Sequence, residues 1–218
     1  IAAADAQYPA NFDARLLKPI AILPASFFLI APSLRTDSST DIERSDTDGT
    51  VAHDAASTAK WRGVTIHRVL QQLCNTADYP APENSIHPIA AQLKIMTAQQ
   101  EPQFLELVEG CTEEALATYN HKEFECIFRP QAEQQTYNEM PLMYTQTHPV
   151  QESVYGFIDR LIKSHDQVTI IDYKSHQIDN EKSAKDIAMQ YVTQLTYYRK
   201  GINRLWPGHK ITTGILFT

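Results

Sequence analysis

Two aspartates and a lysine stand out in this chain because their types and spacing suit metal-assisted cleavage of a phosphodiester bond. Asp159 lies within one apolar run, and Asp172 and Lys174 flank a tyrosine at the end of the next. Two carboxylates held close together repel each other unless a proton or a cation lies between them. Carboxylate oxygens suit Mg²⁺ and Mn²⁺, and a nearby ammonium group can orient water or stabilise charge that develops on phosphorus.

A predicted β-hairpin would bring these side chains together. Residues 154–162 and 168–173 are rich in β-branched and aromatic residues, and a short polar stretch joins them. Folding the runs about this connection puts Asp159 almost opposite Asp172, with Cβ atoms roughly 4.5–5.5 Å apart. Because side chains alternate along a strand, Asp172 and Lys174 share one face. An isolated Asp-x-Lys triplet is more often a plain strand end, so the surrounding motifs decide between the two interpretations.

Two predicted helices would flank this hairpin. Apolar residues recur at helical spacing over residues 184–205, where Gln194 and Tyr198, four positions apart, share one face. A helix over residues 60–74 carries His67 beside an apolar stripe. From the local pattern alone, Tyr198 is also explained as a core aromatic, and His67 as a hydrogen-bonded residue at the edge of the core.

These segments resemble, in order, the motifs of the RecB-type and AddA-type nuclease domain. This domain is a branch of the PD-(D/E)XK nucleases and stands at the C-terminus of bacterial helicase-nucleases of the exonuclease V family. The resemblance is carried by RGVTIH at 62–67, YNEMP at 137–141, GFID at 156–159, IDYKS at 171–175 and QLTYY at 194–198. A single motif of this length matches by chance, whereas the ordered set is specific.

The resemblance implies a role for each matching residue. The ligands of Mg²⁺ or Mn²⁺ would be His67, Asp159, Asp172 and the carbonyl of Tyr173. The catalytic residues would be Lys174, Asp172 and Asp159, with Glu139 in a supporting role. The pair that positions the substrate would be Gln194 and Tyr198. Independently of the resemblance, basic residues near these motifs, Arg160 among them, predict a limited DNA-contact strip.

The expected fold is an α/β restriction-endonuclease-like core, a mixed central β-sheet flanked by helices, with an additional helical N-terminal part. Residues 60–218 would form the nuclease domain. Residues 1–59 would hold an apolar segment and a mobile linker, because residues 36–58 are dense in Ser, Thr, Asp and Ala. Further expected elements are a strand or short apolar segment within residues 21–34 that docks on the nuclease core, two helices between residues 85 and 120 that break near residues 101–102, and a last strand over residues 210–217.

The net charge of the chain limits how strongly it can attract DNA by itself. The 218-residue chain has a formal net charge of −7, and an acidic domain has little long-range attraction for a polyanion. The resemblance implies a helicase motor domain in the same polypeptide, which would deliver the DNA, and a second helicase-nuclease subunit as a further partner. Because the sequence begins with isoleucine, we expect a processed chain or a fragment of a longer helicase-nuclease.

The cysteines and the hydropathy of the chain indicate the cellular compartment. Three cysteines without CxxC spacing argue against a disulfide framework and a structural zinc site, and they are too few for a four-cysteine iron–sulfur cluster. A reducing cytoplasm is the expected location. The most apolar stretch, residues 16–34, contains prolines and a lysine that argue against a membrane-spanning helix.

The leading hypothesis is a metal-dependent deoxyribonuclease of the exonuclease V type that acts in double-strand-break repair and recombination. Two other functions remain open. One is a catalytically silent nuclease fold that guides DNA or docks a partner subunit, although such domains typically lose the acidic or lysine positions that this chain keeps. The other is a stand-alone exonuclease or a CRISPR-associated relative, and the missing cysteine set argues against the latter.

Overall fold

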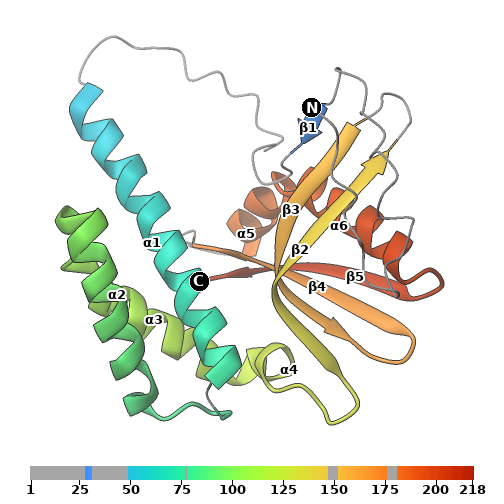
Figure 1. The fold of residues 1–218 in the computed structure, drawn as a ribbon, viewed down its shortest axis with the longest axis horizontal. Coiled ribbons are helices and arrows are strands. Elements are labelled where there is room, and N and C mark those ends of the chain that lie inside the picture. Colours follow the sequence, from blue (N-terminus) through green and yellow to red (C-terminus); the bar gives the residue numbers. More distant parts are fainter. Residues whose placement is uncertain (1–27, 31–48, 77, 147–151, 176–180) are drawn as a thin grey trace, which may run out of the picture.

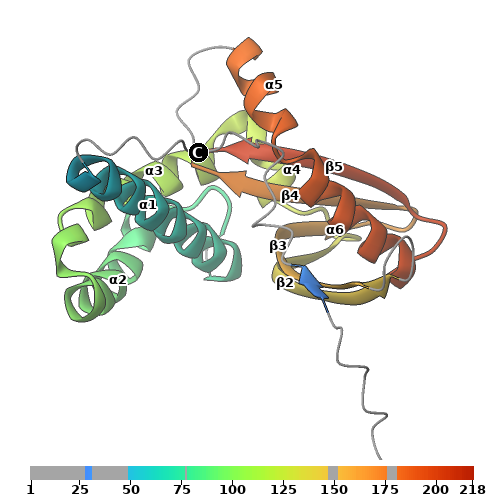
Figure 2. The same ribbon diagram turned by 90° about the horizontal axis from the view of Figure 1, so that it is seen from above.

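The computed structural model describes residues 28–30, 49–76, 78–146, 152–175 and 181–218. In these residues the helices of the N-terminal half lie beside one end of a β-sheet, and a helix of the C-terminal part, α6 (Val192–Leu205), covers one of its faces (Figure 1). The view from above separates the two groups of helices (Figure 2). This arrangement confirms the predicted restriction-endonuclease-like α/β fold with a helical N-terminal part.

The central strand of the five-stranded sheet is β3 (Glu152–Lys163). β2 (Gln135–Gln146) pairs with it antiparallel along its length, and β4 (Gln167–Lys174) pairs antiparallel with its last residues. β1 (Phe28–Ile30) runs parallel to the start of β3, and β5 (Lys210–Phe217) runs parallel to β4. The sheet is therefore mixed, and the hairpin and the last strand lie where the sequence predicts them.

The sequence pattern does not predict β2. Asn138, Glu139 and Pro141 interrupt the alternation of polar and apolar residues that marks a strand. Pro141 is tolerated because β2 pairs on one side with β3 and is an edge strand in the described part of the sheet. Glu139 has a φ of 48°, a left-handed conformation that is uncommon for a residue other than glycine.

Three helices form the N-terminal group: α1 (Gly49–Thr76), α2 (Ile86–Gln100) and α3 (Leu107–Asn120). The inward face of α1 carries Ile66, Val69, Leu70 and Leu73, which are all fully buried. The expected helix 60–74 begins too late, because α1 starts at Gly49, and residues 49–58 of the expected linker are helical. The rest of that linker lies outside the described residues. α2 and α3 confirm the predicted pair, which is separated near residues 101–102.

Four short helical segments connect these elements: η3 (Glu83–Ser85), η4 (Pro102–Phe104), η5 (Lys122–Phe124) and α4 (Glu125–Phe128). In the described residues, no helix is both long enough and apolar enough to cross a membrane.

The single helix predicted over residues 184–205 is two helices, α5 (Glu181–Met189) and α6 (Val192–Leu205). The break falls at Tyr191, whose φ of −106° and ψ of 3° leave the helical region. Within α6, Gly201 permits a close approach to the sheet, since a Cβ atom there would lie 2.7 Å from a methyl carbon of Leu142. The interruption therefore lets α6 lie tightly on the sheet in a direction that α5 does not share (Figure 2).

β4 separates two apolar cores. Val168 and Ile170 pack with Tyr198 of α6, whereas Ile171 and Tyr173 pack into the core formed by α1, α2 and α3. The alternation of strand side chains explains this division, because successive residues point to opposite faces. By the same alternation, Asp172 and Lys174 extend the row of Val168 and Ile170 and lie on the face that α6 covers.

Candidate active site

The candidate site lies where β3 and β4 stop pairing. Their last backbone pair is Arg160 with Ile171, and the next residues on the two strands are Asp159 and Asp172. These strands then separate, and Asp159 Oδ2 accepts a hydrogen bond of 2.6 Å from the N–H of Tyr173. A carboxylate thus occupies the position where the backbone ladder would otherwise continue.

Glu139 joins this row from the other side of β3. Asn138 pairs with Arg160 and Met140 pairs with Ile158, so Glu139 lies opposite Asp159. Register therefore sets three carboxylates, from β2, β3 and β4, at one level of the sheet. The left-handed backbone of Glu139 marks a local irregularity at this level.

The alternation of side chains along β3 changes at the same place. Ile158 and Leu161 both pack beneath α6, although a regular strand would send them to opposite faces. Asp159 and Arg160, between them, both point to the side of α1 and α4. Because of this irregularity, Asp159 points towards α1 and the guanidinium of Arg160 points towards α4.

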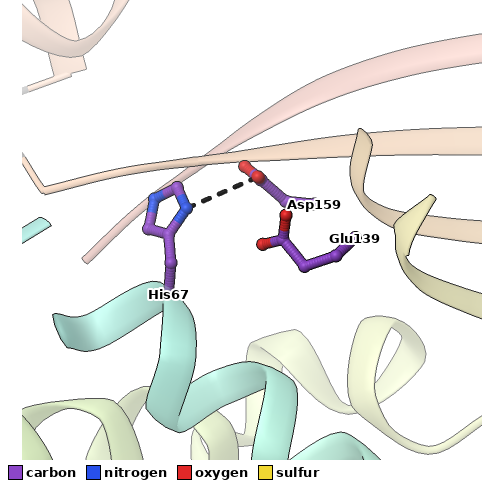
Figure 3. A group of neighbouring side chains, drawn as sticks. All are labelled: His67, Glu139 and Asp159. Carbon is purple, nitrogen blue, oxygen red and sulfur yellow. Dashed lines mark ion pairs between the residues drawn. The ribbon is translucent and has the colours of Figure 1, made fainter. Parts of the chain in front are cut away.

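His67 reaches this site from α1 (Figure 3). Its Nε2 lies 3.0 Å from the carbonyl oxygen of Tyr173. A carbonyl oxygen can only accept a hydrogen bond, so Nε2 is the donor. The other ring nitrogen, Nδ1, lies 3.4 Å from Asp159 Oδ1. One turn earlier, Gly63 lets α1 approach the end of β4, because a Cβ atom there would lie 2.9 Å from Ser175 Oγ. Single ligand atoms of His67, Glu139 and Asp159 all lie within 4.8 Å of one another.

The acidic groups shift one another's protonation. Burial, then the negative charge of Asp159, raises the pKa of Glu139 above its ordinary value. Burial and Asp159 also raise the pKa of Asp172 to about 6, against the opposing effect of Lys174. Burial lowers the pKa of His67, but its hydrogen bond and charge interaction with Asp159 outweigh this and leave the pKa raised. Burial and the charge of Asp159 thus both disfavour the ionised forms of Glu139 and Asp172, and a bound cation would offset both effects.

Lys174 and α6 hold Asp172 from the other face. Lys174 Nζ lies 2.7 Å from Asp172 Oδ2 in an ion pair and 4.6 Å from the centre of the Tyr191 ring. Gln194 Nε2 donates to Asp172 Oδ1 over 3.0 Å and to the hydroxyl of Tyr198 over 3.1 Å. Gln194 and Tyr198 are buried and border the cavity at the site, so they hold Asp172 in place, and their role in positioning the substrate stays a prediction.

Arg160 does not reach the site. Its guanidinium donates to the carbonyl oxygen of Ile127 at 3.1 Å and to Asn138 Oδ1, and the side chain is 1% exposed. A predicted DNA contact by Arg160 is therefore inconsistent with its position. It instead ties α4 to β2, because the shift in alternation at Asp159 turns it into the interior.

The donor set suits a hard divalent cation. Two carboxylates and an imidazole nitrogen converge, and oxygen-rich sets of this kind suit Mg²⁺ and Mn²⁺. The Tyr173 carbonyl lies beside them, within hydrogen-bond distance of His67 Nε2. Asp172 Oδ2 is buried and already forms the ion pair with Lys174 Nζ, so a cation bound there would share this oxygen with the ammonium group. The sequence gives Glu139 only a supporting role, whereas the structure places it in the ligand cluster.

A cavity of about 390 Å³ opens onto these groups. Besides His67, Asp159, Asp172, Lys174, Gln194 and Tyr198, it is lined by Tyr155, Gly156 and Phe157. The two aromatic residues have no predicted role, although their period-two spacing from Asp159 already places all three on one face of a strand. A larger hollow of about 840 Å³, between α1 and η4, lies away from this cluster.

Comparison with curated proteins gives no match. A profile of the PD-(D/E)XK nuclease superfamily matches residues 33–216, which include every side chain of the site. The profile covers most of the chain, and the fold agrees with it. The chain therefore belongs to the PD-(D/E)XK nuclease superfamily.

Proposed function

We propose that this chain is a divalent-metal-dependent DNA nuclease that hydrolyses phosphodiester bonds. One observation carries the proposal: the ligand atoms of His67, Glu139 and Asp159 converge within 4.8 Å beside the Lys174–Asp172 ion pair. Three of the proposed ligands, His67, Asp159 and Asp172, line one cavity together with Lys174, next to the point where β3 and β4 stop pairing.

Each side chain has a distinct task in this scheme. Mg²⁺ or Mn²⁺, when bound, would activate water and neutralise charge on the phosphate. His67, Glu139, Asp159, Asp172 and the Tyr173 carbonyl would hold that cation. Lys174 would direct its ammonium group at the attacking water or the phosphate oxygens, because its Nζ lies at the cavity. Gln194 would keep Asp172 in position through their hydrogen bond.

We further propose that the domain is the nuclease part of a RecB-type or AddA-type helicase-nuclease that acts in the cytoplasm in double-strand-break repair and recombination. The order of the five motifs supports this assignment. The acidic net charge supports delivery of the DNA by a motor domain in the same polypeptide, with a second subunit as a further partner.

Cleavage of linear DNA by the purified chain tests the proposal. We expect cleavage with Mg²⁺ or Mn²⁺, none with a chelator, and a loss of at least about 100-fold in Asp172→Asn, which removes a ligand charge. Asp166→Asn is the matched control, because Asp166 is exposed at the opposite end of the same hairpin, and it should cleave like the wild type. Absence of cleavage, even with the motor domain attached, would falsify the proposal and favour the silent scaffold.

A further inference from the structure

Two exposed aromatic rings lie beside the candidate site. Tyr155 is 39% exposed and Phe157 is 44% exposed, whereas most large apolar residues of the sheet are buried. Both line the cavity of about 390 Å³ that holds His67, Asp159 and Lys174. Exposure of two neighbouring rings in a catalytic cavity requires an explanation other than core packing.

The register of β2 and β3 shows how these rings reach the site. Ile158 packs under α6, so Tyr155 and Phe157 lie on the other face. Met143 pairs with Tyr155, Pro141 pairs with Phe157, and the next positions on that face are Glu139 and Asp159. We call Met143, Pro141, Tyr155 and Phe157 the apolar strip. This strip leads directly to the carboxylates.

The two rings contact each other without stacking. Their centroids are 5.4 Å apart and their planes meet at 76°, so they form an edge-to-face pair and not a closed stack. Unpaired bases stack on such exposed rings regardless of sequence, whereas a duplex keeps its base faces covered. Lys174, in the same cavity, is placed to meet the sugar–phosphate backbone.

The charge of the protein favours the same occupant. With a net charge of −7, the chain gains little from long-range attraction to phosphates, so contacts that do not depend on charge have to contribute to holding a strand. Base stacking is such a contact. The apolar strip is continuous with the candidate active site, which links its occupant to the substrate.

We propose that Tyr155 and Phe157 form a stacking platform for unpaired bases next to the bond that is cut, and that the domain therefore selects single-stranded DNA. This inference rests on the proposed nuclease function. It adds a substrate class and two specificity-determining residues to that function.

A binding experiment without metal tests the platform separately from cleavage. The full chain, in EDTA at low salt, is titrated into a single-stranded oligonucleotide that carries 2-aminopurine, whose fluorescence falls on stacking. We expect Tyr155→Ala and Phe157→Ala each to weaken binding about tenfold and to reduce quenching, from the known contribution of base–aromatic stacking. Tyr155→Phe and Phe157→Tyr keep a ring and should bind like the wild type. Ile95→Ala, which removes an exposed apolar residue from α2, is the matched control.

The two proposals fail in different ways. Ring-dependent quenching supports the platform even when Mn²⁺ produces no cleavage, a result that would contradict only the nuclease function. Equal single-strand binding by wild type, Tyr155→Ala and Phe157→Ala would overturn the platform, as would full retention of binding in Phe157→Leu. A blunt duplex should bind weakly and equally to all variants. Size-exclusion chromatography supplies a further check, because a dimer lost in the alanine variants would make the apolar strip an interface between copies.

Discussion

The two halves of the β3–β4 hairpin differ sharply, although they belong to the same pair of strands. In the closed half, residues 160–163 pair with residues 168–171, and most of these side chains are buried and apolar. In the open half, residues 155–159 and 172–174 lie beyond the end of this ladder and carry the acidic and basic groups of the site. The paired strands of the closed half stabilise the hairpin, and the open half borders the cavity of about 390 Å³.

The difference shows how the fold separates stability from function. Buried carboxylates that lack matching positive charge destabilise a protein, and active sites commonly carry such a cost. Here the destabilising carboxylates lie next to the paired residues of the closed half. This pairing holds the two strands together, so the open half can keep Asp159 and Asp172 close to each other without unfolding the hairpin. The comparison predicts that substitutions in the two halves affect different measurements.

The largest effect is expected on stability from the closed half. Ile170 is fully buried between β3 and α6, so Ile170→Ala should lower the free energy of unfolding by about 2–5 kcal/mol. Asp172→Asn, two residues along β4, should change it by less than about 1 kcal/mol in a chelator, since lost repulsion from Asp159 offsets the lost Lys174 ion pair. Urea unfolding measures both. A larger loss in Asp172→Asn than in Ile170→Ala would contradict the division between the halves.

The next effect is expected on activity from the open half. Lys174→Ala should reduce cleavage by about 100- to 1000-fold, the effect of removing a group that stabilises developing charge. Lys163→Ala is the control, because Lys163 ends β3 in the closed half and lies over Trp206. It should cleave like the wild type. Equal losses in both variants would mean that a general reduction of positive charge, and not the site, explains the result.

Local patterns were sufficient for the hairpin but not for the whole site. Two β-branched runs around a short polar connection fix the register that places Asp159 opposite Asp172. Glu139 could not be placed in this way, because its position depends on pairing between β2 and β3 and on a left-handed backbone. Arg160 was misplaced for a related reason. Regular alternation gives no sign of the shift that turns its guanidinium towards Ile127.

The helix next to the site was also predicted only in part. A continuous apolar stripe predicts one helix over residues 184–205, yet the helix is interrupted at Tyr191. The break puts the Tyr191 ring beside Lys174, a tertiary contact that no local period encodes. Sequence patterns therefore predict elements and register well, while irregular positions that shape the site depend on contacts between distant segments.

Metal binding should stabilise the open half of the hairpin and so raise the free energy of unfolding. At Mn²⁺ concentrations about 100 times the Kd, the free energy of unfolding should rise by about 2.7 kcal/mol. Glu139→Gln should lose most of this gain, because Glu139 lies in the ligand cluster. Glu133→Gln, an exposed change just before β2, should keep it. Thermal unfolding with and without Mn²⁺ provides the measurement, and an undiminished gain in Glu139→Gln would remove Glu139 from the ligand set.

The smallest effect concerns the way α1 meets the open half. Gly63→Ala would bring a Cβ atom to 2.9 Å from Ser175 Oγ, so either this hydroxyl rotates away or α1 shifts, and a shift of α1 would move His67 with it. We expect Mn²⁺ affinity, measured by calorimetry, to fall about tenfold, as for other changes that disturb ligand orientation. Gly110→Ala is the control on α3, since no atom lies within 4 Å of its added Cβ, and helix propensity alone should stabilise it by about 0.5–1 kcal/mol.

The double variant Gly63→Ala/Ser175→Ala separates crowding from any other effect of the methyl group. Removing Ser175 Oγ eliminates the atom that the new Cβ would meet, so affinity for Mn²⁺ should return towards that of the wild type. If Gly63→Ala instead matched Gly110→Ala in both stability and Mn²⁺ affinity, the close approach of α1 to β4 would have no part in placing His67. The open half would then owe its geometry to the strands alone.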